Sequence, residues 1–171
     1  MQQMFRWMIA AVIAVAFAHF SSAAMAQGAV KQIKLTEKHI ESFIAAQKDM
    51  SAVAEKMQGN SDKPDPKIQA ELESVSKKHG FANFAEYDDV AANISMVMAG
   101  IDPQTKAFTD PPTAIKREIE EITADKSMPE KERKQALDEL AEAMKMAQPI
   151  QFPGNIEIVK KYYDRLEPLL Q

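Results

Sequence analysis

Hydrophobic residues recur at intervals of three and four along most of the chain, a spacing typical of amphipathic helices. The first run follows Thr36, an expected helix N-cap, and Leu35 is placed to pack on Ile40 as a hydrophobic staple. Gly59 and Asn60 end this run. Its apolar positions are Ile40, Phe43, Ile44, Met50, Val53, Ala54 and Met57.

A second helix is expected to begin at Asp65 and Pro66, which suit the N-cap and the first helical position. Gly80 should end it, and Phe81 can fold back on Val75 in a Schellman-type contact. The apolar stripe of this helix is Ile68, Leu72 and Val75, and its last turn holds Lys77, Lys78 and His79, which are favourable against the helix dipole.

Asn83 and Glu86 form the pattern of a capping box and predict the start of a third helix that runs up to Gly100. Its apolar positions are Phe84, Tyr87, Val90, Ala91, Ile94, Val97 and Met98. Asp102 and Pro103 then predict a short turn that extends through Phe108.

Asp110 and Pro111 predict the start of a fourth helix, with Ile115, Ile119 and Ile122 on one face. Ser127 and Glu130 suggest another capping box, with Pro129 tolerated in the first turn. This box would open a fifth helix whose stripe is Leu137, Leu140, Ala141 and Met144.

The link at residues 148–154 contains two prolines and a glycine and cannot be helical throughout. Asn155 is expected to cap a last helix, whose end Pro168 disturbs. The stripe of that helix is Ile156, Val159, Tyr163, Leu166 and Leu170. No window shows the alternation typical of strands, so the sequence predicts an all-α fold, a single irregular bundle of five or six amphipathic helices.

The N-terminus has the three parts of a secretory signal peptide. Arg6 supplies the positive charge, an apolar run ends at Phe20, and Ala24 and Ala26 occupy the −3 and −1 positions of a cleavage site. Cleavage is therefore expected before Gln27, which gives a signal peptide at residues 1–26 and a single helical domain at residues 27–171. The apolar run is shorter than the roughly 20 residues that a spanning helix needs.

Composition narrows the classes of function. Removal of Arg6 shifts the formal net charge from −4 to −5, and acidic and basic residues alternate, so the surface is not a nucleic-acid footprint. The absence of cysteine excludes disulfides, thiolate chemistry and a lipidated N-terminal cysteine. Arg6 has no arginine neighbour, so the general secretory route and a periplasmic location are expected.

The spacing of the histidines, methionines and glutamates does not indicate a metal or cofactor site. His39 and His79 lack a second ligand three or four residues away on their own helices. Met96 and Met98, like Met144 and Met146, are two residues apart and point about 200° away from each other on a helix. Glu118-x-x-Glu121 and Glu139-x-x-Glu142 lie opposite the apolar stripes, on solvated faces. We expect no metal ion and no cofactor.

Catalytic motifs are also missing. The chain has no glycine-rich phosphate loop, no Gly-x-Ser-x-Gly elbow, no His-Glu-x-x-His and no EF-hand. We therefore expect a protein that is not an enzyme and has no catalytic residues.

Two resemblances add to this interpretation. Lys77-Lys78-His79-Gly80-Phe81, Glu86-Tyr87, Asn93-Ile94 and Gly100-Ile101-Asp102 make the middle third of the chain similar to small uncharacterised exported helical proteins of Gram-negative bacteria, which implies no activity. Leu35-Thr36-Glu37-Lys38-His39 resembles the Leu-Thr-x-x-Gln element of helical periplasmic stress chaperones, with His39 at the glutamine position.

The function expected from these observations is a non-catalytic protein-interaction module of the cell envelope, whose partner is another envelope protein. One alternative is a carrier of a small apolar ligand or a metal ion. Its ligand would lie between helices near Phe81, Phe84, Tyr87, Phe108 and Phe152. A further alternative is a periplasmic stress chaperone. After cleavage, no stable membrane insertion is expected.

Overall fold

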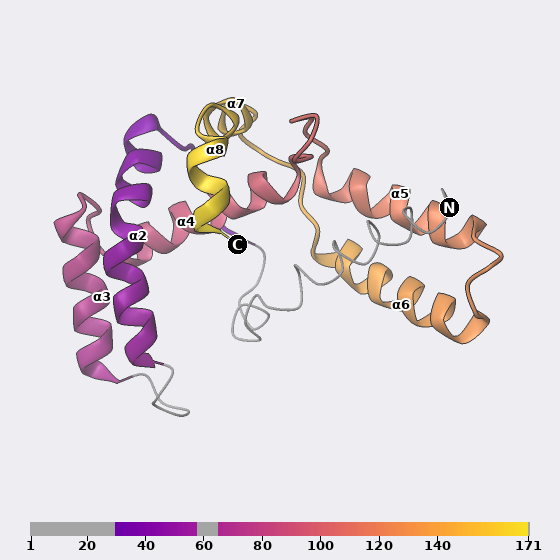
Figure 1. Cartoon of the computed structure of the whole chain (residues 1–171), viewed down its shortest axis with the longest axis horizontal. Coiled ribbons are helices and arrows are strands. Elements are labelled where there is room, and N and C mark those ends of the chain that lie inside the picture. The colour runs from indigo at the N-terminus through magenta and orange to yellow at the C-terminus, as the bar shows by residue number, and fades with distance from the viewer. Residues whose placement is uncertain (1–29, 58–64, 171) are drawn as a thin grey trace.

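The structure, a computed structural model, describes residues 30–57 and 65–170. The described residues form helices and no named strand (Figure 1), which confirms the all-α prediction. The helices are α2 (Glu37–Met57), α3 (Pro66–Lys78), α4 (Phe84–Ala99), α5 (Pro111–Ala124), α6 (Glu130–Met146), α7 (Gly154–Lys161) and α8 (Tyr163–Leu166), followed by the 3₁₀ helix η2 (Glu167–Leu169).

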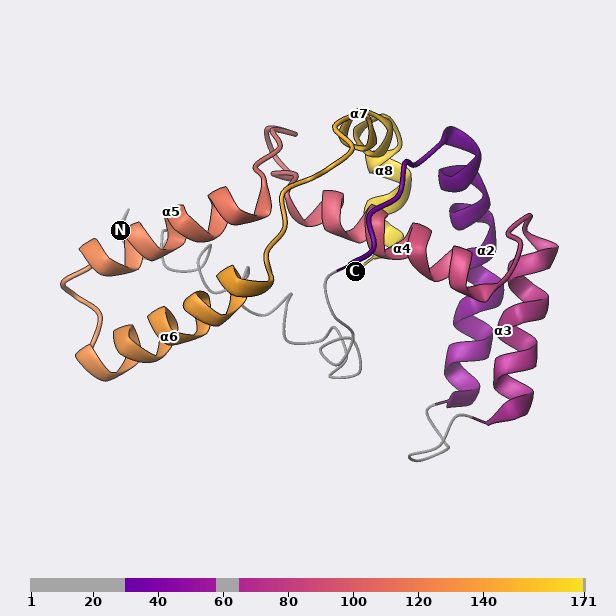
Figure 2. The ribbon, with the colours of Figure 1, turned by 180° about the vertical axis from the view of Figure 1, so that it is seen from behind.

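Helix α4 lies in the middle of the molecule and connects its two ends. The antiparallel pair α2 and α3 packs at one end of α4, and α7 packs across α4 with α8 beside it. The pair α5 and α6 extends from the other end, as the view from behind also shows (Figure 2). The protein thus has a body made of α2, α3, α4, α7 and α8, and a hairpin made of α5 and α6.

The core lies between α2, α4 and the two C-terminal helices α7 and α8. Apart from Leu35, the predicted staple residue, its fully buried apolar members belong to the stripes that the sequence predicts, because those stripes are the faces that these helices turn toward one another. The fully buried apolar residues include Leu35, Ile40, Phe43, Val90, Ile94, Val97, Val159 and Leu166. None of the described residues of α5 or α6 is buried.

Most of the predicted helix ends are confirmed. Thr36 Oγ1 accepts from the His39 backbone N–H at 3.2 Å, and Asp65 caps α3. Gly80 has φ +90°, and the N–H groups of Gly80 and Phe81 donate to Lys77 and Ser76 in the Schellman pattern. Each of these ends is set by a local hydrogen bond, which is why a short sequence pattern identifies it.

Asn83 also caps α4, but the box around it differs from the usual one. Its Oδ1 accepts from Glu86 N at 2.8 Å, as expected. The Glu86 carboxylate reaches back one residue further than in the usual box and accepts from Ala82 N. The predicted turn after α4 is present as well, since Asp102 accepts from Gln104 N and Thr105 N, and an isolated antiparallel bridge joins Ile101 to Phe108.

Two predicted caps are wrong. Helix α6 has Pro129 at its N-cap without a side-chain hydrogen bond, and the Ser127 hydroxyl donates to Asp125 at 2.6 Å. Asp125 competes successfully for Ser127 because it is only two residues away. Asn155 lies inside α7, which begins at Gly154, and its side chain serves a distant backbone segment.

The predicted signal peptide, with Ala24, Ala26 and Gln27, lies outside the described residues. Among residues 30–57 and 65–170, no helix has the length and apolar content needed to cross a bilayer.

Candidate interaction site

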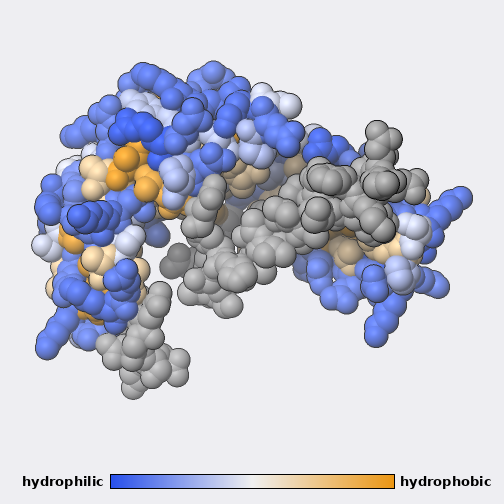
Figure 3. Space-filling model, in the orientation of Figure 1, coloured by the Kyte–Doolittle hydropathy of each residue, from blue (hydrophilic) through white to orange (hydrophobic). Residues whose placement is uncertain are grey.

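The α5–α6 hairpin is the largest feature of the described residues that the body does not cover. The two helices pack chiefly against each other. In Figure 3, the part of this hairpin that is in view shows apolar residues bordered by hydrophilic residues along its lower edge. An amphipathic helix becomes stable mainly by burying its apolar face. Among the described residues, each of these two helices packs mainly on the other.

The contact between the two helices is a narrow seam of apolar side chains, all of them half-buried. The seam consists of Ile115, Ile119 and Ile122 from α5 and Leu137, Leu140 and Met144 from α6. The same residue types are 0% exposed in the body at Ile40 and Ile94. A pair of helices leaves both sides of its seam open to solvent, so full burial needs a third or fourth helix.

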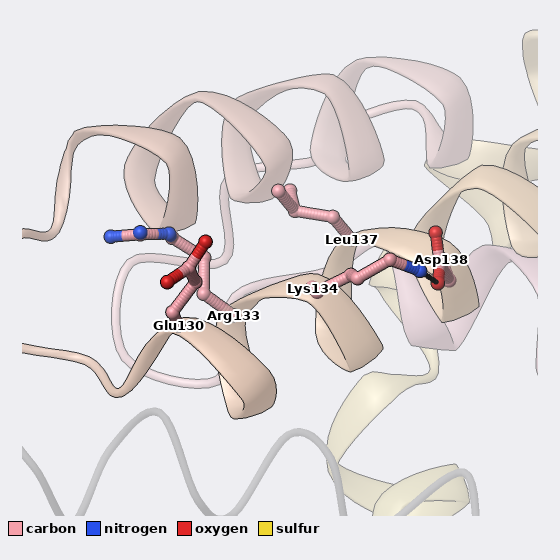
Figure 4. A pocket seen from close by; sticks show the side chains of 5 residues that line it. All are labelled: Glu130, Arg133, Lys134, Leu137 and Asp138. Carbon is pink, nitrogen blue, oxygen red and sulfur yellow. Dashed lines mark hydrogen bonds and ion pairs between the residues drawn. The ribbon is translucent and has the colours of Figure 1, made fainter.

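A shallow hollow of about 300 Å³ opens on α6 beside this seam (Figure 4). Leu137 lines it together with Glu130, Arg133, Lys134 and Asp138. Lys134 donates to Asp138 at 2.8 Å, and Arg133 donates to the backbone oxygen of Asp125 at 3.3 Å across the turn that joins the helices. The hollow therefore offers one apolar side chain surrounded by charges, a lining that suits a protein surface better than an apolar ligand.

In both helices the basic residues are concentrated in the N-terminal half and the acidic residues in the C-terminal half. The first half of α5 carries Lys116 and Arg117, and its second half carries Glu118, Glu120 and Glu121. The first half of α6 carries Lys131, Arg133 and Lys134 with two glutamates, and its second half carries three acids and Lys145. Glu121 in the last turn of α5 is unfavourable for the helix dipole, which prefers bases there, whereas the end turns of α6, with Glu130 and Glu132 first and Lys145 last, are favourable.

The ion pairs found on the hairpin stay within single helices. Arg117 pairs with Glu121 at 3.8 Å, Lys134 with Asp138 at 2.8 Å and Lys145 with Glu142 at 2.6 Å. Among the described residues, no ion pair joins α5 to α6. Such exposed pairs contribute little to stability, so these charges remain available to a partner.

The base of the hairpin is fixed to the body by hydrogen bonds. Asp110 Oδ1 accepts from Ile150 N at 3.0 Å, which joins the entry and exit of the hairpin. Gln32 donates to Pro149 O at 2.9 Å and accepts from Gln151 N at 2.8 Å. Asp110 is thus at the predicted helix start, but it makes no N-cap hydrogen bond because its carboxylate is used here.

Gln32 belongs to an extended N-terminal segment, residues 31–35, that two buried asparagines hold in place. Asn93 accepts from Ile33 N at 3.0 Å and donates to Lys31 O at 2.9 Å. Asn155 accepts from Leu35 N and donates to Ile33 O, both at 2.8 Å. Both side chains are 2% exposed, and each amide satisfies one donor and one acceptor of the segment, as a neighbouring strand would.

The histidine His79, predicted as a helix-end residue, forms a cluster with an acid that the sequence did not single out. His79 Nε2 lies 2.8 Å from Asp49 Oδ2, and Lys78 donates to the same oxygen at 2.7 Å. These hydrogen bonds, first that of Lys78 and then that of His79, lower the pKa of Asp49 to about 2. A second shallow hollow lies beside this cluster between α2 and α3 and is lined by both charged and apolar side chains.

The other candidate metal ligands do not converge. His39 lies in the first turn of α2, and its Nδ1 is buried without a hydrogen-bond partner among the described residues. Met50 is 7% exposed in the core, and Met146 is 50% exposed at the end of the hairpin. Within the described residues, no three His, Cys, Asp or Glu side chains are grouped so that they could hold a metal ion.

The five aromatic residues named for the carrier alternative do not surround a common cavity. Tyr87 stacks on Phe43 and Phe84 and contacts Phe81 edge to face, with ring centroids 5.4–5.9 Å apart. Burial is the main cause that raises the pKa of Tyr87. Phe108 packs against Gly100 instead, and Phe152 lies in the link before α7. The aromatic rings fill the interior themselves.

A second polar cluster joins the start of α2 to the end of α7. The Tyr162 hydroxyl donates to Glu37 and Glu41 at 3.1 Å each, and Lys161 donates to Glu37 at 2.8 Å. Burial and the two carboxylates raise the pKa of Tyr162 to about 12. This cluster couples the two helices at the molecular surface and contains no unpaired nucleophile.

Over residues 30–57 and 65–170, the fold and this site define a class, an all-α protein with a compact body and a helical hairpin that the body leaves uncovered. Beyond that class, no protein-family model, no curated protein and no solved structure matches the chain.

Proposed function

We propose that the protein is an exported, non-catalytic interaction module of the cell envelope, and that the α5–α6 hairpin is the surface that binds its protein partner. The observation that carries this proposal is the half-burial of all six seam residues of the hairpin, whereas the stripes of α2, α4, α7 and α8 each contain fully buried residues. A helix that covers this seam removes apolar surface from water, which is the main driving force of protein association.

The polar surroundings support binding to a protein in preference to a membrane. Charged residues of both signs flank the seam on α5 and α6. A polar rim around an apolar strip is the usual composition of a protein interface. An amphipathic helix that lies on a membrane has a broad apolar face and a basic polar face instead.

The proposal is tested by photo-crosslinking in cells that export the full chain. A photo-reactive residue replaces Ala141, which is exposed beside the seam, and a matched variant carries it at Ala45, which is exposed on α2. We expect an adduct of defined mass from position 141 and none from position 45. Equal labelling at both positions, or none at position 141, would refute the hairpin as the binding surface.

The same cells test export. Intact-mass analysis of the processed protein should give an N-terminus at Gln27 in the periplasmic fraction, because Ala24 and Ala26 form the expected cleavage site. A membrane-bound chain that retains Trp7 would contradict both the cleavage and the proposed location.

A further inference from the structure

We propose that the partner of the hairpin is a second copy of this chain, so that two α5–α6 hairpins pack face to face into an antiparallel four-helix bundle. This inference rests on the proposed function, since it names the partner of the same surface. Two observations carry it, the order of charges along the two helices and the size of the uncovered face.

The charge order makes the hairpin complementary to itself. A two-fold axis that lies in the interface, perpendicular to the helices, brings α5 against α5 and α6 against α6 of the other copy, each pair antiparallel. The positive half of α5, with Lys116 and Arg117, then lies near a negative half of a partner helix, and Glu120 and Glu121 lie near a positive one. α6 has the same polarity, so it gains from the same arrangement.

This polarity has a cost in α5 within the single chain. The acids at the end of α5 face the negative end of its helix dipole, and the hairpin contains no ion pair between its helices among the described residues to offset this. Pairing with a second copy supplies opposite charges to both halves. Because α5 and α6 are antiparallel in the hairpin, this order already places unlike charges side by side within one chain, and a second copy extends the same pattern across the interface.

The size of the face is sufficient for a modest interface. Helix α5 has 14 residues and α6 has 17, which gives lengths of about 21 and 25 Å. Two packed helices are about 20 Å wide, so the face of one hairpin covers about 450 Å². Pairing two such faces buries on the order of 1,000 Å², the lower limit for a specific interface and the size of a weak or transient one.

The seam residues fit the interior of such a bundle. Ile115, Ile119 and Ile122 are spaced by four and three residues, and Leu137, Leu140 and Met144 by three and four. This is the spacing of side chains that interdigitate between helices crossing at about 20°. Ala136 and Ala141 beside the α6 stripe are small enough to let a second pair of helices approach.

The experiment is sedimentation of the purified processed chain over a range of concentrations, with charge-reversed variants. The first variant, Lys116→Glu with Arg117→Glu, makes α5 acidic throughout. The second, Glu120→Lys with Glu121→Lys, makes it mainly basic. We expect the wild type to dimerise, each variant alone to dimerise at least about tenfold more weakly, and an equimolar mixture of the two to regain the wild-type affinity.

The control is Lys38→Glu with Lys48→Glu, two exposed positions on α2, which should leave the dimer unchanged. Circular dichroism and thermal melting check that each variant keeps its helices. The proposal is overturned by a wild type that stays monomeric up to about 100 μM. It is equally overturned by a mixture that stays as weak as its components, or by a dimer that neither reversal weakens.

Failure of this inference is distinguishable from failure of the proposed function. A monomeric wild type with an adduct to a different protein at position 141 would refute the second copy and retain the hairpin as a binding surface. A monomeric wild type without any adduct at that position would refute both. A dimer whose crosslink at position 141 joins two copies of the chain supports both.

Discussion

Replacement of Asn155 by alanine should destabilise the protein by about 0.3–2.3 kcal/mol, the cost of a buried unsatisfied donor less the gain in helix propensity. The change leaves the Leu35 N–H without its acceptor, and Leu35 is 1% exposed. An unsatisfied buried donor costs about 1–3 kcal/mol. Ile33 O loses its donor as well, but Ile33 is half-buried and its oxygen regains a hydrogen bond from water. The better helix propensity of alanine offsets at most about 0.7 kcal/mol of this destabilisation.

Urea unfolding followed by circular dichroism measures this difference, and Asn83→Ala is the matched control. Asn83 is exposed and caps α4, so its replacement should cost about 1 kcal/mol. Hydrogen exchange should also show that the Leu35 amide loses protection in Asn155→Ala and keeps it in Asn83→Ala. A destabilisation below about 0.3 kcal/mol, with Leu35 still protected, would refute the role assigned to Asn155.

The pairing of the two asparagines gives a second test of the same reasoning. Asn93 and Asn155 both bond to Ile33, so either substitution is expected to release the N-terminal segment as a unit. The double variant should then cost less than the two single variants together, by about 1 kcal/mol. Strict additivity would mean that the two asparagines act independently.

Three further outcomes are expected. Gly80→Val should cost about 1–2 kcal/mol in urea unfolding because φ is +90° there, whereas Gly154→Val, whose added Cβ meets nothing within 4 Å, should cost little. Gly100→Ala should lower the melting temperature, because the new Cβ would lie 2.5 Å from the Phe108 ring and 2.6 Å from Thr109 O, and an unchanged melting temperature would contradict this geometry. For Asp49, the folded pKa of about 2 lies below the unfolded value, so its stabilisation is present above about pH 4 and is lost as the pH falls toward 2. The difference in urea midpoint between wild type and Asp49→Asn should therefore shrink over that range, and a constant difference would show that the charge of Asp49 is not involved.

The helices themselves could be predicted from the sequence because their signals are local. A stripe at intervals of three and four residues, closed by a cap within one turn, identifies α3 and α4 with little reference to the rest of the chain. The same property explains the errors at α6 and α7. Ser127 and Asn155 are residue types that often cap helices. The Ser127 hydroxyl, however, hydrogen-bonds to the nearby Asp125, and the Asn155 side chain hydrogen-bonds to the distant backbone of Leu35.

The hydrogen-bond partners of Asn93 and Asn155 could not be predicted, because no sequence pattern near either asparagine indicates them. Asn93 bonds to a segment about 60 positions away, and Asn155 to one about 120 positions away. A buried asparagine in a helix differs from an exposed one only through its surroundings, which the tertiary fold creates. The Asp49 cluster was missed for the same reason, since α3 must first pack on α2.

The amphipathic pattern of α5 and α6 was visible in the sequence, but not that these helices leave the common core. A stripe shows that a face is to be buried without showing what buries it. The N-terminal segment explains why the hairpin extends from the body. Asn93 and Asn155 hold the segment on α4 and α7, and its Gln32 fixes the chain where it leaves α6. Because Asp110 closes the same base, the hairpin is presented in a fixed orientation. A rigid presentation reduces the entropy lost on binding, which favours the proposed binding of a partner over binding by the same two helices on a loose tether.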